Sequence, residues 1–382
     1  MSRHKCNEFL STLHLPRHPA VNAAVRNATA RAVAAQETPA RRVWDLTPFG
    51  YELPMLMLRF RTLEMAVDGF LVTESTTTHT NNERKPAVLT EALSSNRTLL
   101  PDRLLAKIHV RVLDFAKEKQ RFCPTPNMRC FEALQRFVLL EMLFKVAAPE
   151  DLALVGDTDE FARPSVVNNL RLCYPFDAEA RLPDFVVLRL TLFKFGVHCD
   201  HGNTFELGTR AFSVGTLLGH YGSYRSANAQ QLGGMSAAFT ATRSRTFTAP
   251  VIPNAGWHLT SLGTSFELAR KLRTFLHSNI FNAPGSVSKG SLDEMRLERC
   301  MKYCLELDKP ASVPPCLGRS DPRSRPLPGT LRTALPAGGE LPRELVHHRS
   351  QYPTAWFRFL PSVDPDLGAR AASSRVSPQL VQ

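Results

Sequence analysis

The stretch Leu152-Ala153-Leu154-Val155-Gly156-Asp157-Thr158-Asp159-Glu160 decides the fold class. Its first four residues are all apolar, which is typical of a strand buried on both faces of a parallel sheet. A glycine and three acidic residues follow this strand directly. In open parallel sheets, ligands bind beyond the carboxyl ends of the strands. The stretch therefore predicts an α/β protein with an acidic site at one end of its sheet.

Helical and strand-like patterns alternate on both sides of this stretch. Apolar residues at helical spacing predict helices over 53–65, 128–147, 265–276 and 291–307. Short apolar or alternating runs predict strands over 70–73, 108–112 and 185–195. This order favours an open, mostly parallel sheet with helices on both faces.

The two ends of the chain differ in composition from the middle. Residues 1–42 are rich in Arg and Ala and are predicted to form a disordered or targeting arm. Residues 310–342 contain eight prolines, which predicts a Pro/Arg-rich tail over 310–382. A short aromatic patch in this tail, at 356–360, is a candidate to dock back on the domain. Residues 43–309 would then form the main folded domain.

The net charge of +12 belongs mostly to these ends. Residues 1–42 hold seven Lys/Arg against two acids and residues 310–382 hold nine against five, so residues 43–309 carry only +3. A nucleic-acid groove needs clustered Lys and Arg with aromatic residues on the folded part, so we expect no nucleic-acid partner. The sequence also has no run near the roughly 18 apolar residues that a membrane span requires.

The eight cysteines do not form the pattern of a small disulfide scaffold or a zinc site. Buried free thiols are the favoured interpretation, because free cysteine packs as a small apolar residue. Pairing of some cysteines stays open for a secreted chain.

Asp157 and Asp159 are candidate ligands of one divalent cation. Mg²⁺ and Mn²⁺ take one or two carboxylates and complete their shell with water and phosphate oxygens. A nucleotide-sugar donor would supply such a diphosphate, and the metal would neutralise the charge that grows on it as it leaves. The residues alone leave an equal alternative, in which a solvated turn caps the next helix. A second Asp-x-Asp, Asp364-Pro365-Asp366, lies in the tail without this context.

A phosphatase of the haloacid-dehalogenase type is a rival interpretation of the same acidic stretch. Its first aspartate would be the nucleophile. Such enzymes have Thr or Val two positions after the second aspartate, where this chain has Phe161. This rival therefore ranks well behind the metal site.

The segment Ala255-Gly256-Trp257-His258 is a second marker. Glycine in a strand suggests close approach of backbone near a ligand, and an aromatic face suits a sugar or base. A core tryptophan beside a hydrogen-bonded histidine explains the segment equally well.

Several of these segments together resemble glycosyltransferase family 17, the family of the β-1,4-mannosyl-glycoprotein 4-β-N-acetylglucosaminyltransferase. Its amino-terminal signature is similar to Tyr51-Glu52-Leu53 … Leu58-Arg59 … Leu63 … Val67-Asp68-Gly69-Phe70-Leu71-Val72-Thr73-Glu74-Ser75, then Lys85-Pro86. Asp157-Thr158-Asp159-Glu160 resembles its acidic motif and Ala255-Gly256-Trp257-His258 its Gly-Trp-His motif. Glu267-Leu268-Ala269-Arg270-Lys271-Leu272 follows at the usual distance, so the resemblance spans residues 45–309.

The resemblance implies a GT-A-like fold and an inverting transfer of N-acetylglucosamine from UDP-GlcNAc to a glycan hydroxyl, assisted by Mn²⁺ or Mg²⁺. The partners implied are a UDP-sugar donor and a glycan or glycoprotein acceptor. The family's animal members are anchored in the Golgi membrane by an amino-terminal helix, which implies N-glycan processing in the secretory pathway. Because no such anchor is seen in this sequence, a soluble or organellar location stays open. A non-catalytic member that binds a glycan or nucleotide sugar is the alternative function.

Site residues follow from the matched motifs. Asp157 and Asp159 would hold the metal, and the substrate contacts would come from Glu74, Asp157, Trp257 and His258. Inversion requires a general base for the acceptor hydroxyl, for which Glu160 and Glu267 are the candidates. Structural roles compete for two of these residues. A helix cap or core-edge carboxylate explains Glu74 equally well, and for Glu267 an exposed acid paired with Lys271 four residues on is the favoured interpretation.

Overall fold

The computed structural model covers eight stretches of the chain. These are residues 6–13, 41–79, 84–118, 128–173, 185–194, 200–221, 249–274 and 341–356, with gaps inside them at 7, 10, 97, 116, 206–207 and 354–355. The helix predicted over 291–307 lies outside them.

One half of the sheet consists of parallel strands. These are β1 (Val43–Phe49), β2 (Gly69–Ser75), β3 (Ile108–Leu113) and β4 (Leu152–Val155), in the order β3-β2-β1-β4. Each neighbouring pair is parallel. From β1 the chain passes to β2 on one side, whereas β4 lies on the other, so the carboxyl ends of β1 and β4 flank the point where the strand order reverses. Open α/β sheets bind their ligands at such a point.

The other half of the sheet is mixed. It continues from β4 through β8 (Arg210–Ser213), β6 (Phe185–Lys194), β9 (Val251–Thr260) and the short β5 (Glu160–Ala162), while β7 (Asp200–Phe205) pairs with β6. The β6–β9 pair is parallel and the other pairs in this half are antiparallel. We call residues 156–160 the acidic turn. The antiparallel β5–β9 pair places it beside the Gly-Trp-His segment, residues 256–258.

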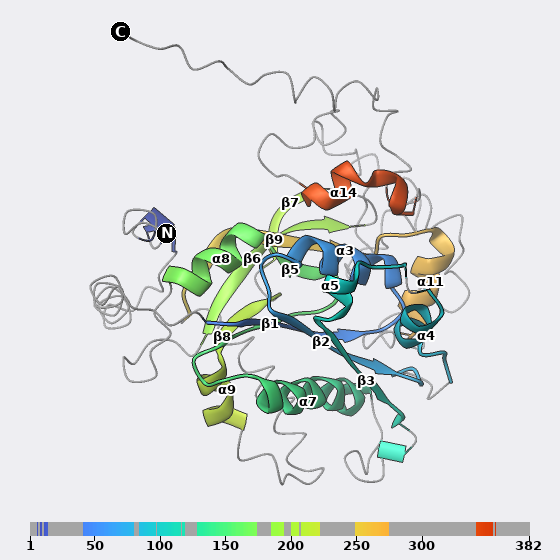
Figure 1. Ribbon diagram of the computed structural model, residues 1–382. Coiled ribbons are helices and arrows are strands. Elements are labelled where there is room, and N and C mark those ends of the chain that lie inside the picture. Colours follow the sequence, from blue (N-terminus) through green and yellow to red (C-terminus); the bar gives the residue numbers. More distant parts are fainter. Residues whose placement is uncertain are drawn as a thin grey trace, which may run out of the picture.

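Helices cover both faces of the sheet, which confirms the predicted α/β class (Figure 1). One face carries α7 (Met128–Val146) and α9 (Val214–Tyr221), and the other carries α3 (Leu53–Leu63), α5 (Asp102–Leu105) and α8 (Pro164–Cys173). The short helix α4 (Val88–Ser95) and α11 (Ser265–Thr274) lie toward the carboxyl ends of β2 and β3 in this view.

The strands bury side chains on both faces. In β4, Leu152 and Leu154 join the core under α3 and α8, whereas Ala153 and Val155 join the core under α7. Successive side chains of a strand point to opposite faces, so a strand between two helical layers must be apolar at every position. This is the physical reason for the run of four apolar residues before the acidic turn.

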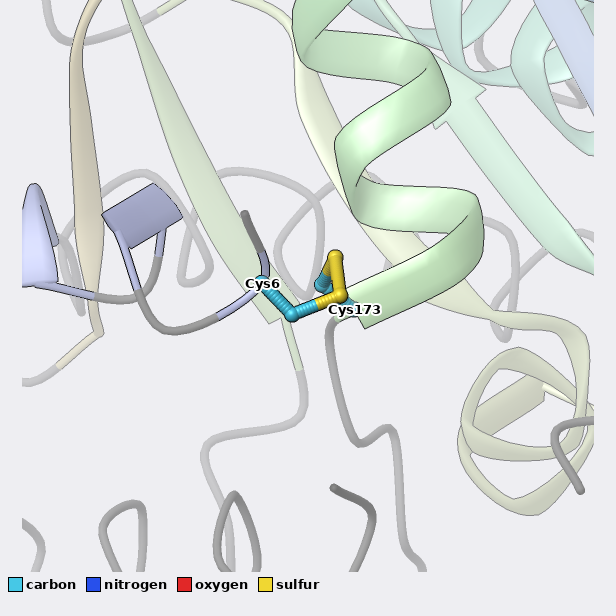
Figure 2. The surroundings of a disulfide bond; sticks show 2 residues. All are labelled: Cys6 and Cys173. Carbon is cyan, nitrogen blue, oxygen red and sulfur yellow. A yellow bond between two sulfur atoms is a disulfide. The ribbon is translucent and has the colours of Figure 1, made fainter. Parts of the chain in front are cut away.

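A segment near the N-terminus is bonded to this domain. Cys6 forms a disulfide with Cys173, the last residue of α8, with 5.2 Å between their Cα atoms (Figure 2). Phe9 and Leu13 of the same segment are buried in the core of that face. Cys130 is also disulfide-bonded, and the described residues include no free cysteine. The expectation of free thiols is therefore wrong for these cysteines, because folding brings together residues 167 positions apart.

A segment near the C-terminus also packs on the domain. The helix α14 (Arg343–His347) and the 3-10 turn Arg349–Gln351 lie against α3 (Figure 1). Leu345 is fully buried, and the rings of Tyr352 and Trp356 stack at 5.6 Å. Residues that the composition assigned to the tail therefore contribute to the core, including Trp356 of the predicted aromatic patch. Burial raises the pKa of Tyr352 to about 12.

No helix within the described ranges is both long and apolar enough to cross a membrane.

Candidate active site

The acidic turn follows β4 at the carboxyl end of the sheet. Gly156 opens the turn, and a Cβ atom there would lie 2.3 Å from Oγ1 of Thr209. The Thr209 hydroxyl donates to the carbonyl oxygen of Glu160 at 2.8 Å, so the turn is packed tightly against the start of β8. Only glycine leaves room for this contact. The glycine between strand and acids is therefore required by packing.

Asp157 is the more exposed of the two aspartates, with 38% of its side chain accessible. Its Oδ1 accepts a hydrogen bond from Nη2 of Arg136, which lies on α7. Arg136 also pairs with Glu132, one turn earlier on α7, at 3.0 Å. Burial lowers the pKa of Arg136, but its attraction to Asp157 and Glu132 outweighs burial and raises the pKa overall. A permanent cation therefore lies beside this carboxylate.

Asp159 is nearly buried and lies between two basic side chains. Nζ of Lys271, from α11, donates to Oδ2 at 3.1 Å, and Nε2 of His258, from β9, lies 3.7 Å from Oδ1. Burial raises the pKa of Asp159, but Lys271 and then His258 lower it, and the net direction is downward. Asp159 is therefore an ionised carboxylate at neutral pH.

Glu52 shares Lys271 with Asp159. It follows β1, and its Oε1 accepts a hydrogen bond from Lys271 Nζ at 2.9 Å. Burial raises the pKa of Glu52, and the negative charge of Asp159 adds to this against the opposing effect of Lys271. One ammonium thus lies between carboxylates that follow the neighbouring parallel strands β1 and β4. Sequence separation hides this contact, since 219 positions separate Lys271 from Glu52.

Glu160 is buried at the end of the turn. One carboxylate oxygen, Oε2, accepts a hydrogen bond from the backbone N–H of Asp157 at 3.2 Å, and the other, Oε1, lies 4.0 Å from Nε2 of His258. Glu160 and His258 are also paired residues of β5 and β9. The structure therefore brings Asp157, Asp159, Glu160 and His258 together, as one cluster.

The Gly-Trp-His segment owes its glycine to strand packing. A Cβ atom on Gly256 would lie 2.2 Å from the carbonyl oxygen of Phe161 and 2.8 Å from Cα of Ala162. The expected close backbone approach is therefore to β5. Trp257 is 4% exposed, with its ring 5.8 Å from that of Phe161 and the guanidinium of Arg163 over it at 4.5 Å. This placement matches the core alternative for Trp257 more closely than an open sugar-binding face.

Two other candidate residues cap helices. Both carboxylate oxygens of Glu74 accept hydrogen bonds from the start of α4, from the N–H groups of Leu89 at 2.9 Å and Thr90 at 3.1 Å. Glu267 accepts from the N–H of Thr264 at 2.7 Å, and the Thr264 hydroxyl accepts from the N–H of Glu267 at 3.2 Å. The second arrangement is a capping box, and the Thr-x-x-Glu spacing of 264–267 was the signal for it in the sequence. The structure thus places Glu74 in the helix-cap role and gives Glu267 a partner other than Lys271.

Arg59 belongs to the stretch that resembles the amino-terminal signature, but sequence reasoning gave it no role; it is fully buried on α3. Its guanidinium pairs with both oxygens of Asp45 on β1 and reaches the backbone of the acidic turn. A charged residue between Leu58 and Phe60, on a helix that is otherwise apolar at buried positions, was the available signal, because arginine is almost never fully buried unless it is paired.

The carboxylates of the acidic turn fit a hard divalent cation. Asp157 and Asp159 offer oxygen ligands, and Asp159 is held in its ionised form. In the part of the chain that the structure describes, no group of three His, Cys, Asp or Glu side chains is placed to hold a metal by itself. Mg²⁺ and Mn²⁺ need only one or two carboxylates when phosphate oxygens and water supply the rest. A cation at Asp159 would have to share that carboxylate with Lys271 or take its place.

Comparison with known families decides the class of protein. The sequence profile of glycosyltransferase family 17 matches residues 11–202, about half of the chain. The chain belongs to glycosyltransferase family 17. No match was found among curated proteins.

Membership of family 17 makes the chain a glycosyltransferase with a sugar donor and a glycan acceptor. The matched range of this glycosyltransferase contains β1 to β5 and the whole acidic turn. The Gly-Trp-His segment and Lys271 lie beyond the matched range. In the folded chain, β9 and α11 place them in contact with the acidic turn.

Proposed function

We propose that this glycosyltransferase transfers N-acetylglucosamine from UDP-GlcNAc to a glycan hydroxyl, with inversion and with the help of Mn²⁺ or Mg²⁺. The observation that carries the proposal is the place of Asp157 and Asp159. They follow β4 at the carboxyl end of the parallel strands, next to the point where the strand order reverses. Ligands of open α/β sheets bind there, and two carboxylates are what a phosphate-bound Mg²⁺ takes from a protein.

In this proposal the aspartates hold the cation and the basic residues around them face the diphosphate. The cation would supply Lewis-acid stabilisation of the leaving diphosphate. Arg136 and Lys271 already pair with the two aspartates, so they are the side chains placed to attract an anion at the same spot. His258 lies 3.7 Å from Asp159 and would help to orient this carboxylate.

Glu160 is the general base that we propose for the acceptor hydroxyl. Its carboxylate belongs to the cluster of the acidic turn, whereas the carboxylate of Glu267 is engaged in the cap of α11. Inversion by one displacement needs a base on the face of the sugar opposite to the leaving UDP. Replacing Glu160 by Gln should abolish transfer while UDP-GlcNAc still binds, which isothermal titration calorimetry measures.

The donor and the metal are tested together by UDP release. The full chain is incubated with a panel of UDP-sugars and a mannose-containing N-glycan, with Mn²⁺, with Mg²⁺ or with EDTA. We expect release with UDP-GlcNAc and a divalent cation, and a fall of at least a hundredfold in Asp159→Asn, since Lewis-acid stabilisation contributes several kcal/mol. Asp364→Asn, in the second Asp-x-Asp, is the matched control and should retain full activity.

Two results would contradict this proposal. Full activity of Asp159→Asn with an intact circular dichroism spectrum would remove the metal role. Calorimetric binding of UDP-GlcNAc without any UDP release would instead favour the non-catalytic, nucleotide-sugar-binding alternative.

We also propose that the protein acts in the secretory pathway, where N-glycan processing takes place. The support is the Cys6–Cys173 disulfide, because such bonds form and persist in oxidising compartments. Mass spectrometry of the alkylated protein, purified from its native cells without reduction, should recover these two cysteines unalkylated. Recovery of both as free thiols would argue against that location.

A further inference from the structure

The backbone of the acidic turn is hydrogen-bonded to the buried guanidinium of Arg59. Nη1 of Arg59 donates to the carbonyl oxygens of Asp157 and Glu160, at 2.6 Å each. These carbonyls belong to the first and last residues of the acidic segment 157–160. One nitrogen atom therefore fixes both ends of the segment that carries the proposed metal ligands.

A rigid anchor holds this guanidinium in place. Nε and Nη2 of Arg59 donate to the two carboxylate oxygens of Asp45, at 2.7 Å each. Arg59 and Asp45 are 0% and 1% exposed, on α3 and β1 respectively. Two parallel N–H···O bonds define the plane of the guanidinium as well as its position. The position of the turn is thereby tied to β1, which lies between β2 and β4 in the parallel half of the sheet.

Stability alone is a weak reason for such a pair. The desolvation of two buried charges roughly cancels their attraction, and well-packed apolar residues often serve stability as well or better. Geometry is what an apolar pair could not supply. Mg²⁺ demands nearly ideal octahedral coordination, and groups that orient metal ligands typically change metal affinity 10- to 100-fold when they are replaced.

We propose that Arg59, anchored by Asp45, is a positioning residue that sets the geometry in which Asp157 and Asp159 hold the divalent cation. This inference rests on the proposed function. It predicts that the shape of the guanidinium matters as well as its charge. Lysine carries the same charge, but its ammonium cannot form the fork that joins one carboxylate to two carbonyl groups.

The test compares Arg59→Lys with Arg42→Lys in the full chain. Arg42 is the control because it also pairs with an aspartate beside β1 but at the amino end of the strand: Nε and Nη2 of this half-exposed arginine both contact Oδ2 of Asp151. Calorimetry measures Mn²⁺ binding in the presence of UDP, urea unfolding measures stability, and kcat and KM for UDP-GlcNAc are measured across Mn²⁺ concentrations. Asp45→Asn, which keeps the shape of the anchor, is included in case Arg59→Lys does not fold.

We expect Arg59→Lys to bind Mn²⁺ at least tenfold more weakly than the wild-type protein does. Asp45→Asn should also bind Mn²⁺ more weakly, and the Mn²⁺ affinity of Arg42→Lys should be unchanged. Activity of Arg59→Lys should recover in part at high Mn²⁺. Wild-type Mn²⁺ affinity in a folded Arg59→Lys or Asp45→Asn protein would overturn the positioning role of Arg59 but not the proposed function. An equal loss of affinity in Arg42→Lys would overturn it as well, since general loosening would then be the cause. Absence of Mn²⁺ binding in the wild-type protein would instead overturn the proposed metal-assisted function, and this inference with it.

Discussion

The two ends of the β1–β4 strand pair each carry a buried aspartate, and the two aspartates differ in the groups that contact them. At the amino end, Asp151 accepts hydrogen bonds from the backbone N–H groups of Arg42 and Ala148 and from Nε1 of Trp44, and it also pairs with the half-exposed guanidinium of Arg42. At the carboxyl end, Asp159 contacts the side chains of Lys271 and His258. Backbone and indole donors are fixed by the fold, whereas a lysine ammonium on a flexible stem can move away. Both aspartates are buried and paired, but Asp151 is held in addition by fixed backbone and indole donors, whereas Asp159 is paired with basic side chains that a ligand could replace.

The largest expected effect is on stability, at the amino end. Asp151→Ala leaves buried donors without an acceptor, at a cost of about 1–3 kcal/mol for each such group, so the free energy of unfolding should fall by about 3 kcal/mol or more. Urea unfolding measures this fall. The activity of each folded molecule should not change. If activity fell as steeply as in Asp159→Asn, the two ends of the strand pair would not be functionally distinct.

The next effect concerns the packing that joins the acidic turn to β9. Gly256→Ala would place Cβ 2.2 Å from a backbone carbonyl that has little room to move, so we expect a loss of about 1–3 kcal/mol and a loss of activity. Gly219→Ala on α9 is the control, because a Cβ there meets nothing within 4 Å. Alanine in a helix is favoured over glycine by about 1 kcal/mol, so this variant should be neutral or slightly more stable. Equal stability of the two variants would contradict the close approach.

A smaller effect is expected in the pH dependence of stability. Because the pKa of Asp159 is lowered in the folded protein, its ionised form stabilises the fold above the ordinary value of 3.8, and this is lost as pH falls through the lowered pKa. Lys271 is the strongest of the groups that lower this pKa. Lys271→Met should raise the pKa of Asp159 in the folded protein toward its unfolded value, so the stability that this group loses on acidification should be smaller, as measured by urea unfolding of the metal-free protein. Lys117→Met, at an exposed lysine, should leave the profile unchanged.

The smallest effect is expected for Glu267→Gln. Glutamine preserves much of the capping box, so the free energy of unfolding should fall by no more than about 1 kcal/mol. Transfer activity should stay within twofold of wild type. A loss of a hundredfold or more, with the helix content intact, would make Glu267 rather than Glu160 the general base.

Much of the fold could be predicted from the sequence because the patterns are local. The predicted ranges 53–65, 128–147, 108–112 and 185–195 correspond to α3, α7, β3 and β6 within a few residues. A strand between two helical layers must be apolar at every position, and a helix on one face must repeat its apolar residues every three or four positions. The strand order and directions in the mixed half of the sheet could not be predicted, since they depend on partner strands that are far away in the chain.

The sequence by itself determined that a buried strand ends in a glycine and two aspartates, which located the acidic turn, and several motifs in order together indicated the family. Tertiary structure alone decided which charges surround it. Lys271 reaches Glu52 and Asp159 across more than a hundred positions, Arg59 reaches the turn from α3, and Glu74 is engaged at the start of α4. The physical reason is that a side chain's partners depend on the packing of whole elements, whereas a strand or a turn depends on residues close in sequence.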